Sequence, residues 1–288
     1  MRVLVTGGRG FLGRRVLGLG GQHEILSLER STASPRPGIR TLVGDLARPA
    51  SWQSAAAEFA PECCIHLAWD GLPDYSLAKC QQNLDTNVGL IEALTALKVP
   101  RLVVSGTCWE YGLTEGRQQE DARPGDLSVF AATKHAIRLV LDSAYRDAGL
   151  QYRWARVFFA YGAGQRPQSL IPYLRDCIKA GTTPTFREPG AAQDFVHVDD
   201  VARGLWALAE CSGPSGTFNL GSGTPTTVGE IANLVAGHYG REPWLAPGPP
   251  VSGIWADTSK ARTVAGWQPA IGIRDGVAST LTALDATA

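Results

Sequence analysis

The chain opens with MRVLVTGGRGFLG, residues 1–13, in which an apolar, β-branched run leads directly into a turn rich in glycine. Gly7, Gly10 and Gly13 stand three residues apart, and helical spacing follows over residues 11–19. A strand, a glycine turn and a helix in this order suit a dinucleotide, because the turn lets a pyrophosphate approach the backbone at a helix N-terminus. The stretch therefore predicts a dinucleotide site, with Phe11 and Leu12 beside the cofactor.

Strand and helix patterns alternate from this turn to about residue 160. Strands are expected at 24–28, 41–43, 64–68, 101–105 and 152–159, and helices at 51–59, 77–97 and 131–148. This alternation predicts an α/β fold with a doubly wound parallel sheet of Rossmann type over residues 1–160. Glycine and proline are denser afterwards, which predicts a smaller substrate-binding lobe over residues 161–288, partly interleaved with the first domain. Within it, strands are expected at 196–198 and 218–220, and helices at 199–210 and 228–239.

The composition is that of a globular protein. Of the 288 residues, 44% are hydrophobic and 19% charged, and Lys plus Arg equal Asp plus Glu at 27 each. Balanced charge argues against nucleic acid as a partner. The cysteines show no C-x-x-C spacing, the start lacks a signal-peptide pattern, and no apolar run reaches the roughly 20 residues of a membrane span. We expect a cytoplasmic protein with reduced cysteines, no metal site and no membrane contact.

The ends of the next strands provide candidates for the adenosine half of the cofactor. Glu29 follows the second strand, where an acid accepts hydrogen bonds from the ribose of NAD. Arg30 beside it, and Arg9 in the glycine turn, suit the 2′-phosphate of NADP. The choice between NAD and NADP therefore stays open. Asp45 and Leu46 follow the third strand and are expected near the adenine.

The fourth strand ends in His66-Leu67-Ala68-Trp69. It ends at the carboxyl edge, where open α/β sheets bind their ligands. Leu67, Ala68 and Trp69 are therefore expected along the cofactor channel. His66 lies inside an apolar strand and is expected to be a hydrogen-bonded core residue rather than a base.

Motifs along nearly the whole chain resemble one enzyme family. They are, in order, TGGRGFLG (6–13), GDL (44–46), HLA (66–68), NLDTN (83–87), SGT (105–107) with YG (111–112), Lys134, Arg156 with YG (161–162), DFVHVDDVA (194–202), FNLGSG (218–223) and GW (266–267). Together they resemble the extended short-chain dehydrogenase/reductase family, within it the NAD-dependent epimerase/dehydratase group. The resemblance implies an NAD or NADP cofactor and a nucleotide-sugar substrate.

The resemblance also implies which side chains move the proton. Thr107 matches the Ser or Thr that binds the reacting sugar oxygen, and Ser105 precedes it on the cofactor side. Lys134 matches the lysine that holds the nicotinamide ribose and lowers the pKa of a catalytic tyrosine. That tyrosine should stand four residues before Lys134, where this chain has Phe130. A phenyl ring can neither donate nor accept a proton.

Three explanations for Phe130 stay open. In the first, it is an engineered replacement that traps substrate in an ordinary enzyme. In the second, another group supplies the proton, and the candidates are Tyr111, Tyr161, Cys108, His135 and a water held by Thr107. In the third, the protein binds dinucleotide and sugar without turnover.

The residues after Thr107 bear on the type of reaction. The group's 4,6-dehydratases carry Asp-Glu there, whereas this chain has Cys108-Trp109, so the resemblance argues against dehydration. It favours a 4-ketoreductase of a 4-keto-6-deoxy sugar, with a nucleotide-sugar 4-epimerase as the alternative. A catalytically silent binding protein is the alternative of another class. Glu110 and Glu115 are expected to be solvated loop carboxylates.

Aromatic and guanidinium groups in the second lobe suit a nucleotide diphosphate. The substrate contacts expected there and beside the reacting centre are Trp109, Phe159, Leu170, Phe186 and Arg187. The helices at 77–97 and 131–148 carry apolar stripes. Because helices like these form a four-helix bundle between subunits in the family, the resemblance favours a homodimer.

Overall fold

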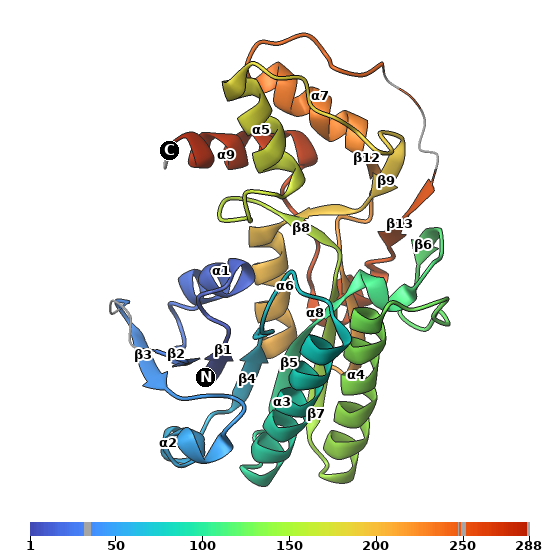
Figure 1. Cartoon of the computed structure of the whole chain (residues 1–288). Helices are drawn as coiled ribbons and strands as arrows, with labels where there is room; N and C mark the ends of the chain where they lie inside the picture. The colour runs from blue at the N-terminus through green and yellow to red at the C-terminus, as the bar shows by residue number, and fades with distance from the viewer. Residues whose placement is uncertain (32–35, 247, 249–251, 287–288) are drawn as a thin grey trace.

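The computed structural model describes residues 1–31, 36–246, 248 and 252–286. Its centre is a seven-stranded sheet in which every neighbouring pair is parallel (Figure 1). In spatial order the strands are β11 (Gly216–Leu220), β7 (Gln151–Val157), β5 (Arg101–Thr107), β4 (Cys63–His66), β1 (Arg2–Thr6), β2 (Glu24–Glu29) and β3 (Ile39–Val43). The predicted α/β fold with a Rossmann-type parallel sheet is confirmed.

Helices cover both faces of this sheet, as crossover connections between parallel strands require. One face packs against α1 (Phe11–Leu19) and α6 (Val198–Glu210), and the other against α2 (Gln53–Phe59), α3 (Leu77–Ala96) and α4 (Val129–Asp147). Along β1, Val3 and Val5 belong to the first core and Leu4 to the second. A strand buried on both faces needs such a continuous apolar run.

A smaller lobe lies above the carboxyl edge of the sheet (Figure 1). Its core lies among α5 (Leu170–Ala180), α7 (Val228–His238) and α9 (Ile273–Ala286). Two small sheets connect it to the main body: β8 (Phe159–Tyr161) with β10 (Phe195–His197), and β12 (Thr226–Thr227), β9 (Ala191–Gln193), β13 (Ser252–Ala256) and β6 (Gly116–Gln118). The remaining helices are η1 (Pro49–Ser51), η2 (Cys108–Tyr111) and α8 (Ser259–Ala265).

One difference from the expected elements concerns the strand predicted at 152–159. It ends at Val157, and a second strand begins at Phe159. The N–H of Phe158 still donates to Leu220 of the main sheet at 3.0 Å, but the N–H of Phe159 donates to Asp194 at 3.0 Å. The backbone therefore leaves the main sheet here and enters the second lobe. Helices α5 and α9 were not among the expected elements.

Candidate functional site

The glycine turn joins β1 to α1, and it leaves no room for a Cβ atom at Gly7 or at Gly13. Gly7 has φ +71°, and a Cβ added to it would lie 2.7 Å from the backbone N of Ala68. A Cβ on Gly13 would lie 2.1 Å from the carbonyl oxygen of Gly7. No described side chain caps α1 at Gly10. The turn thus brings the N-terminus of a helix, with Phe11 in its first turn, close to the carboxyl ends of β1 and β4, as a dinucleotide requires.

Glu29 ends β2 beside this turn, and its carboxylate is already held. Its oxygens accept hydrogen bonds from Ser27 Oγ at 3.0 Å and from Arg36 Nη1 at 3.0 Å, and Arg9 Nε donates to it as well. Arg30 points elsewhere, because its guanidinium pairs with Asp70 at 2.7 Å. Among the described residues, the arginines that contact Glu29 are therefore Arg9 and Arg36, and only Arg9 was predicted from the sequence.

The other cofactor candidates lie along the same edge. Asp45 caps its own turn by accepting from the N–H of Ala47 at 3.0 Å, and it pairs with Arg48. Leu12 and Leu67 lie partly buried against the core under α1, and Leu46 against the core on the opposite face. His66 is a satisfied core residue, as expected: its ring nitrogens lie 2.6 Å from Thr6 Oγ1 and 2.9 Å from Asn87 Oδ1.

Thr107, Ser105, Lys134 and Trp69 come together at the carboxyl ends of β5 and β4. Lys134 is 5% exposed; its Nζ donates to the carbonyl oxygen of Ser105 at 2.9 Å and lies 4.4 Å from the ring centre of Trp69. Burial lowers the pKa of Lys134 to about 8. Thr107 ends β5, and its Oγ1 accepts from the N–H of Trp109 at 3.3 Å. The Lys134 ammonium therefore lies near the carboxyl end of β5, the strand that Thr107 ends.

Glu110 lies directly beneath these residues and is fully buried, so the expectation of a solvated carboxylate was wrong. Its Oε1 accepts from the N–H of Thr107 at 2.9 Å and from Trp154 Nε1 at 2.8 Å. Arg156, itself buried, pairs with it at 3.4 Å. Exposed loop carboxylates are common, and only the tertiary position of Trp154 and Arg156 makes this one internal. Glu115 is exposed, as expected.

Phe130 lies one helical turn before Lys134, at the centre of an aromatic cluster. Its ring centre is 5.0 Å from that of Trp69, 5.0 Å from that of Tyr75 and 5.7 Å from that of Trp109. Trp109 is 40% exposed and forms the outer edge of the cluster. The sequence analysis missed Tyr75, because it lies in an irregular loop outside every motif.

Burial changes the acid–base properties of four groups that were considered in place of the missing tyrosine. Tyr111 donates to Asn219 Oδ1 at 2.7 Å, and burial raises its pKa to about 12. Tyr161 belongs to the core of the second lobe, and burial raises its pKa further. Burial also raises the pKa of the Cys108 thiol and lowers that of His135.

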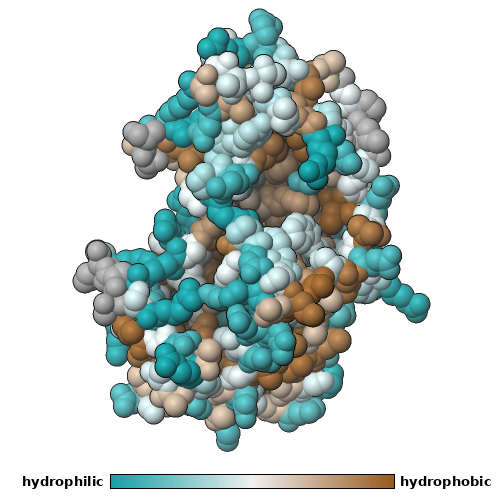
Figure 2. All heavy atoms as spheres, in the orientation of Figure 1, coloured by the Kyte–Doolittle hydropathy of each residue, from teal (hydrophilic) through white to brown (hydrophobic). Residues whose placement is uncertain are grey.

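Two of the expected substrate contacts line one cavity between the lobes. Phe159 and Leu170 border a space of about 190 Å³ together with Ala160, Tyr161, Gln165, Ile171, Gln193 and Phe195. Figure 2 shows a hollow with an apolar floor below the upper lobe. Phe186 does not line this cavity and is partly buried against the second lobe's core, and Arg187 is exposed on the loop after it.

The described residues contain no group of three or more His, Cys, Asp or Glu side chains arranged to hold a metal ion. Within the same residues, no helix combines the length and the apolar character needed to cross a bilayer.

Comparisons with known proteins agree with this geometry. The sequence profile of the NAD dependent epimerase/dehydratase family matches residues 3–221. The dTDP-6-deoxy-L-talose 4-dehydrogenase (NAD(P)(+)) of Kitasatospora kifunensis is 33% identical over 98% of this chain and 95% of its own length. The UDP-glucuronate 4-epimerase of Thermodesulfobacterium geofontis is 29% identical over 75% of this chain and 70% of its own length.

Solved structures show the same architecture over the full length. MoeE5 in complex with UDP-glucuronic acid and NAD is 26% identical, covers 100% of both chains and has a TM-score of 0.86. The UDP-glucose 4-epimerase of Thermus thermophilus in complex with NAD is also 26% identical, covers 100% of both chains and has a TM-score of 0.84. This chain is thus an enzyme that belongs to the NAD dependent epimerase/dehydratase family.

Proposed function

We propose that the enzyme is an NAD(P)-dependent 4-ketoreductase of a nucleotide-linked 4-keto-6-deoxy sugar. The observation that carries the proposal is the buried Lys134, whose ammonium donates to the carbonyl oxygen of Ser105 near the carboxyl end of β5, the strand that Thr107 ends. The relative from Kitasatospora kifunensis supports the 4-keto position, because its name describes a 4-dehydrogenase.

The residues present fit the dinucleotide, because side chains at Gly7 and Gly13 would fill the cradle. When bound, the reduced nicotinamide supplies a hydride. Lys134 would hold the nicotinamide ribose and keep a positive charge near the forming alkoxide, and Thr107 would donate to the sugar oxygen. Phe159 and Leu170 would contact the nucleotide end of the substrate.

A panel assay tests this function. The purified protein is mixed with NADPH or NADH and with dTDP-, UDP-, GDP- and CDP-linked 4-keto-6-deoxy sugars, and loss of reduced cofactor is followed by absorbance. We expect stoichiometric oxidation of the cofactor by at least one sugar. Conversion of a sugar to its 4-epimer without net cofactor consumption would replace the reductase with an epimerase. No turnover of any sugar would favour the silent binding protein.

For the cofactor we propose that NADPH binds more tightly than NADH, because Arg9 and Arg36 both contact Glu29, the residue expected at the adenosine ribose. Arg9→Ala removes one of them and is expected to weaken NADPH binding about tenfold, since charge-assisted contacts to phosphate are strong, and to change NADH binding little. Tryptophan fluorescence titration measures both affinities. Arg40→Ala is the control, since Arg40 pairs with Glu24 at the far end of β2. Equal losses for both cofactors would contradict the proposal.

We also propose a homodimer formed through α3 and α4. Leu77 is 71% exposed, Leu139 50% and Val140 39% on these two helices. Figure 2 shows apolar atoms over the part of the surface where Figure 1 shows α3 and α4. Sedimentation equilibrium at micromolar concentration would give twice the 30.7 kDa chain mass. A cytoplasmic location stays a prediction.

A further inference from the structure

We propose that Tyr75 is the catalytic residue that donates the proton in place of the tyrosine replaced by Phe130. This inference rests on the proposed reductase function. Tyr75 lies in the loop between β4 and α3, in none of the motifs of the chain. Its ring packs on Phe130 and also on Trp109, at 5.0 and 5.6 Å between ring centres.

These two contacts place the Tyr75 ring beside two residues that neighbour the expected site. Phe130 is one helical turn before Lys134, and the backbone N–H of Trp109 donates to Thr107 Oγ1. The Tyr75 ring contacts Phe130 and Trp109, so it lies on the same side of the molecule as the residues next to the Lys134 ammonium and the Thr107 hydroxyl. Tyr75 is half-buried, and none of the described residues forms a hydrogen bond with its hydroxyl. Its hydroxyl is thus available for a substrate oxygen, unlike that of Tyr111, which is committed to Asn219.

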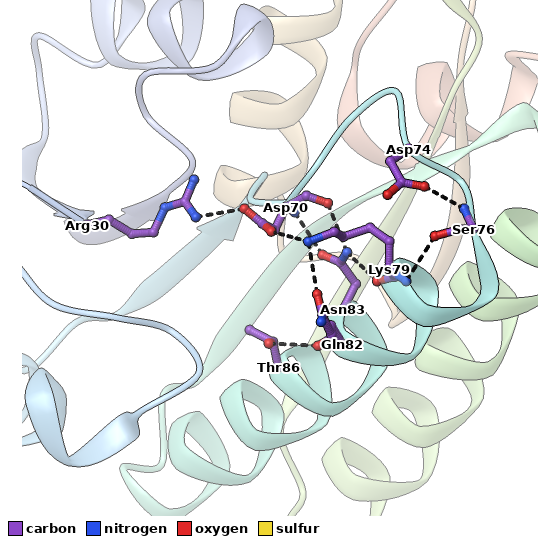
Figure 3. Close-up of polar contacts among 8 residues, drawn as sticks. All are labelled: Arg30, Asp70, Asp74, Ser76, Lys79, Gln82, Asn83 and Thr86. Carbon is purple, nitrogen blue, oxygen red and sulfur yellow. Dashed lines mark hydrogen bonds and ion pairs between the residues drawn. The ribbon is translucent and has the colours of Figure 1, made fainter.

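The loop that carries Tyr75 is anchored at both ends (Figure 3). At its start, the backbone of Asp70 both donates to and accepts from the side-chain amide of Asn83, at 2.8 and 3.0 Å. The Asp70 carboxylate pairs with Arg30 at 2.7 Å and with Lys79 at 2.9 Å.

At the end of the loop, Ser76 caps α3. Its Oγ accepts from the N–H of Lys79, and its own N–H donates to Asp74. The carbonyl of Tyr75 also accepts from the thiol of Cys80 at 3.7 Å. Because the backbone is fixed at Asp70 and at Ser76, the loop between them holds Tyr75 in a defined place, which proton transfer requires.

The proposed step balances as a carbonyl reduction. When bound, the reduced nicotinamide would supply the hydride for the C–H bond at the keto carbon, and the C=O π electrons would move to oxygen. That oxygen takes the proton as the O–H bond of Tyr75 breaks, which leaves a phenolate. Because Tyr75 is half-buried, water restores the proton of the phenolate.

A double-mutant cycle tests the assignment. Tyr75→Phe, Phe130→Tyr and the double variant are compared with the unchanged enzyme in the sugar assay. Tyr75→Phe is expected to lower kcat by about a hundredfold or more while leaving the KM for the sugar nearly unchanged. In the Phe130→Tyr background, the same change should cost little, since a phenol then stands beside Lys134.

Two further measurements separate catalysis from structure. Tyr75→Phe should leave NADPH affinity unchanged by fluorescence titration, because the hydroxyl is not part of the expected cofactor site. Tyr152→Phe is the matched control, since its hydroxyl donates to Asp142 near the amino end of β7, and it should leave kcat and the KM for the sugar unchanged.

The outcomes distinguish this inference from the proposed function. If Tyr75→Phe lowers kcat equally in the unchanged enzyme and in the Phe130→Tyr variant, or lowers it in neither, Tyr75 is not the proton donor. The reductase function would still stand, because the sugar is turned over. Sugar reduction by the Phe130→Tyr variant, together with an inactive unchanged enzyme, would also overturn the role of Tyr75 and leave the reductase function standing. No turnover by any of the four proteins would overturn both.

Discussion

Lys134→Met is expected to lower kcat/KM for sugar reduction by about a thousandfold, because it removes the positive charge that faces the forming alkoxide. The ammonium is 5% exposed and donates to Ser105, so water cannot replace it. Methionine fills a similar volume beside Trp69, and the fold should be retained. Steady-state kinetics with the preferred cofactor, beside a thermal melt, measure the effect. A loss of less than tenfold would contradict the assigned role.

The same lysine predicts the pH dependence of the reaction. Burial lowers its pKa to about 8, so it is charged below pH 8 and neutral above. Activity that needs the ammonium is therefore complete at pH 6–7 and declines as the pH rises through about 8. Lys134→Arg keeps the charge at all these pH values. In that variant the decline should move to higher pH, and an unmoved profile would assign it to another group.

Glu110→Ala is expected to lower the free energy of unfolding by about 3–5 kcal/mol, since it leaves the buried guanidinium of Arg156 without its carboxylate. The substitution also leaves the indole N–H of Trp154 without the Glu110 carboxylate as its hydrogen-bond acceptor. For a chain of this size the midpoint of thermal unfolding should fall by roughly 10 °C. Differential scanning calorimetry measures it. Glu115→Ala, at an exposed position in the following loop, is the control and should change the midpoint little.

The parts of the molecule that local pattern dictates were predictable from the sequence. The glycine turn at Gly7 and Gly13 and the apolar strand runs yielded the parallel sheet, because both depend on neighbours within a few residues. The motifs also pointed to Lys134, which contacts Ser105 near the carboxyl end of β5. Their assigned roles, like those of the other site residues, stay predictions.

What escaped prediction depends on contacts between distant segments. Glu110 is internal only because Trp154 and Arg156, from β7, reach it. Tyr75 joins the cluster around Phe130 through a loop whose shape no periodicity encodes. Likewise the strand break at Phe158 depends on two distant segments, because Leu220 accepts from the N–H of Phe158 and Asp194 accepts from the N–H of Phe159.

The position of β11 at the border of the main sheet has a consequence for any truncated form of the chain. This strand covers the outer side of β7 and contributes Phe218 and Leu220 to the core. A fragment of residues 1–160 would leave the hydrogen-bonding groups of β7 open along a hydrophobic edge, the geometry that seeds aggregation. The main sheet is therefore complete only when β11, from the later part of the chain, has paired with β7. We expect the two parts of the chain to unfold in one cooperative transition.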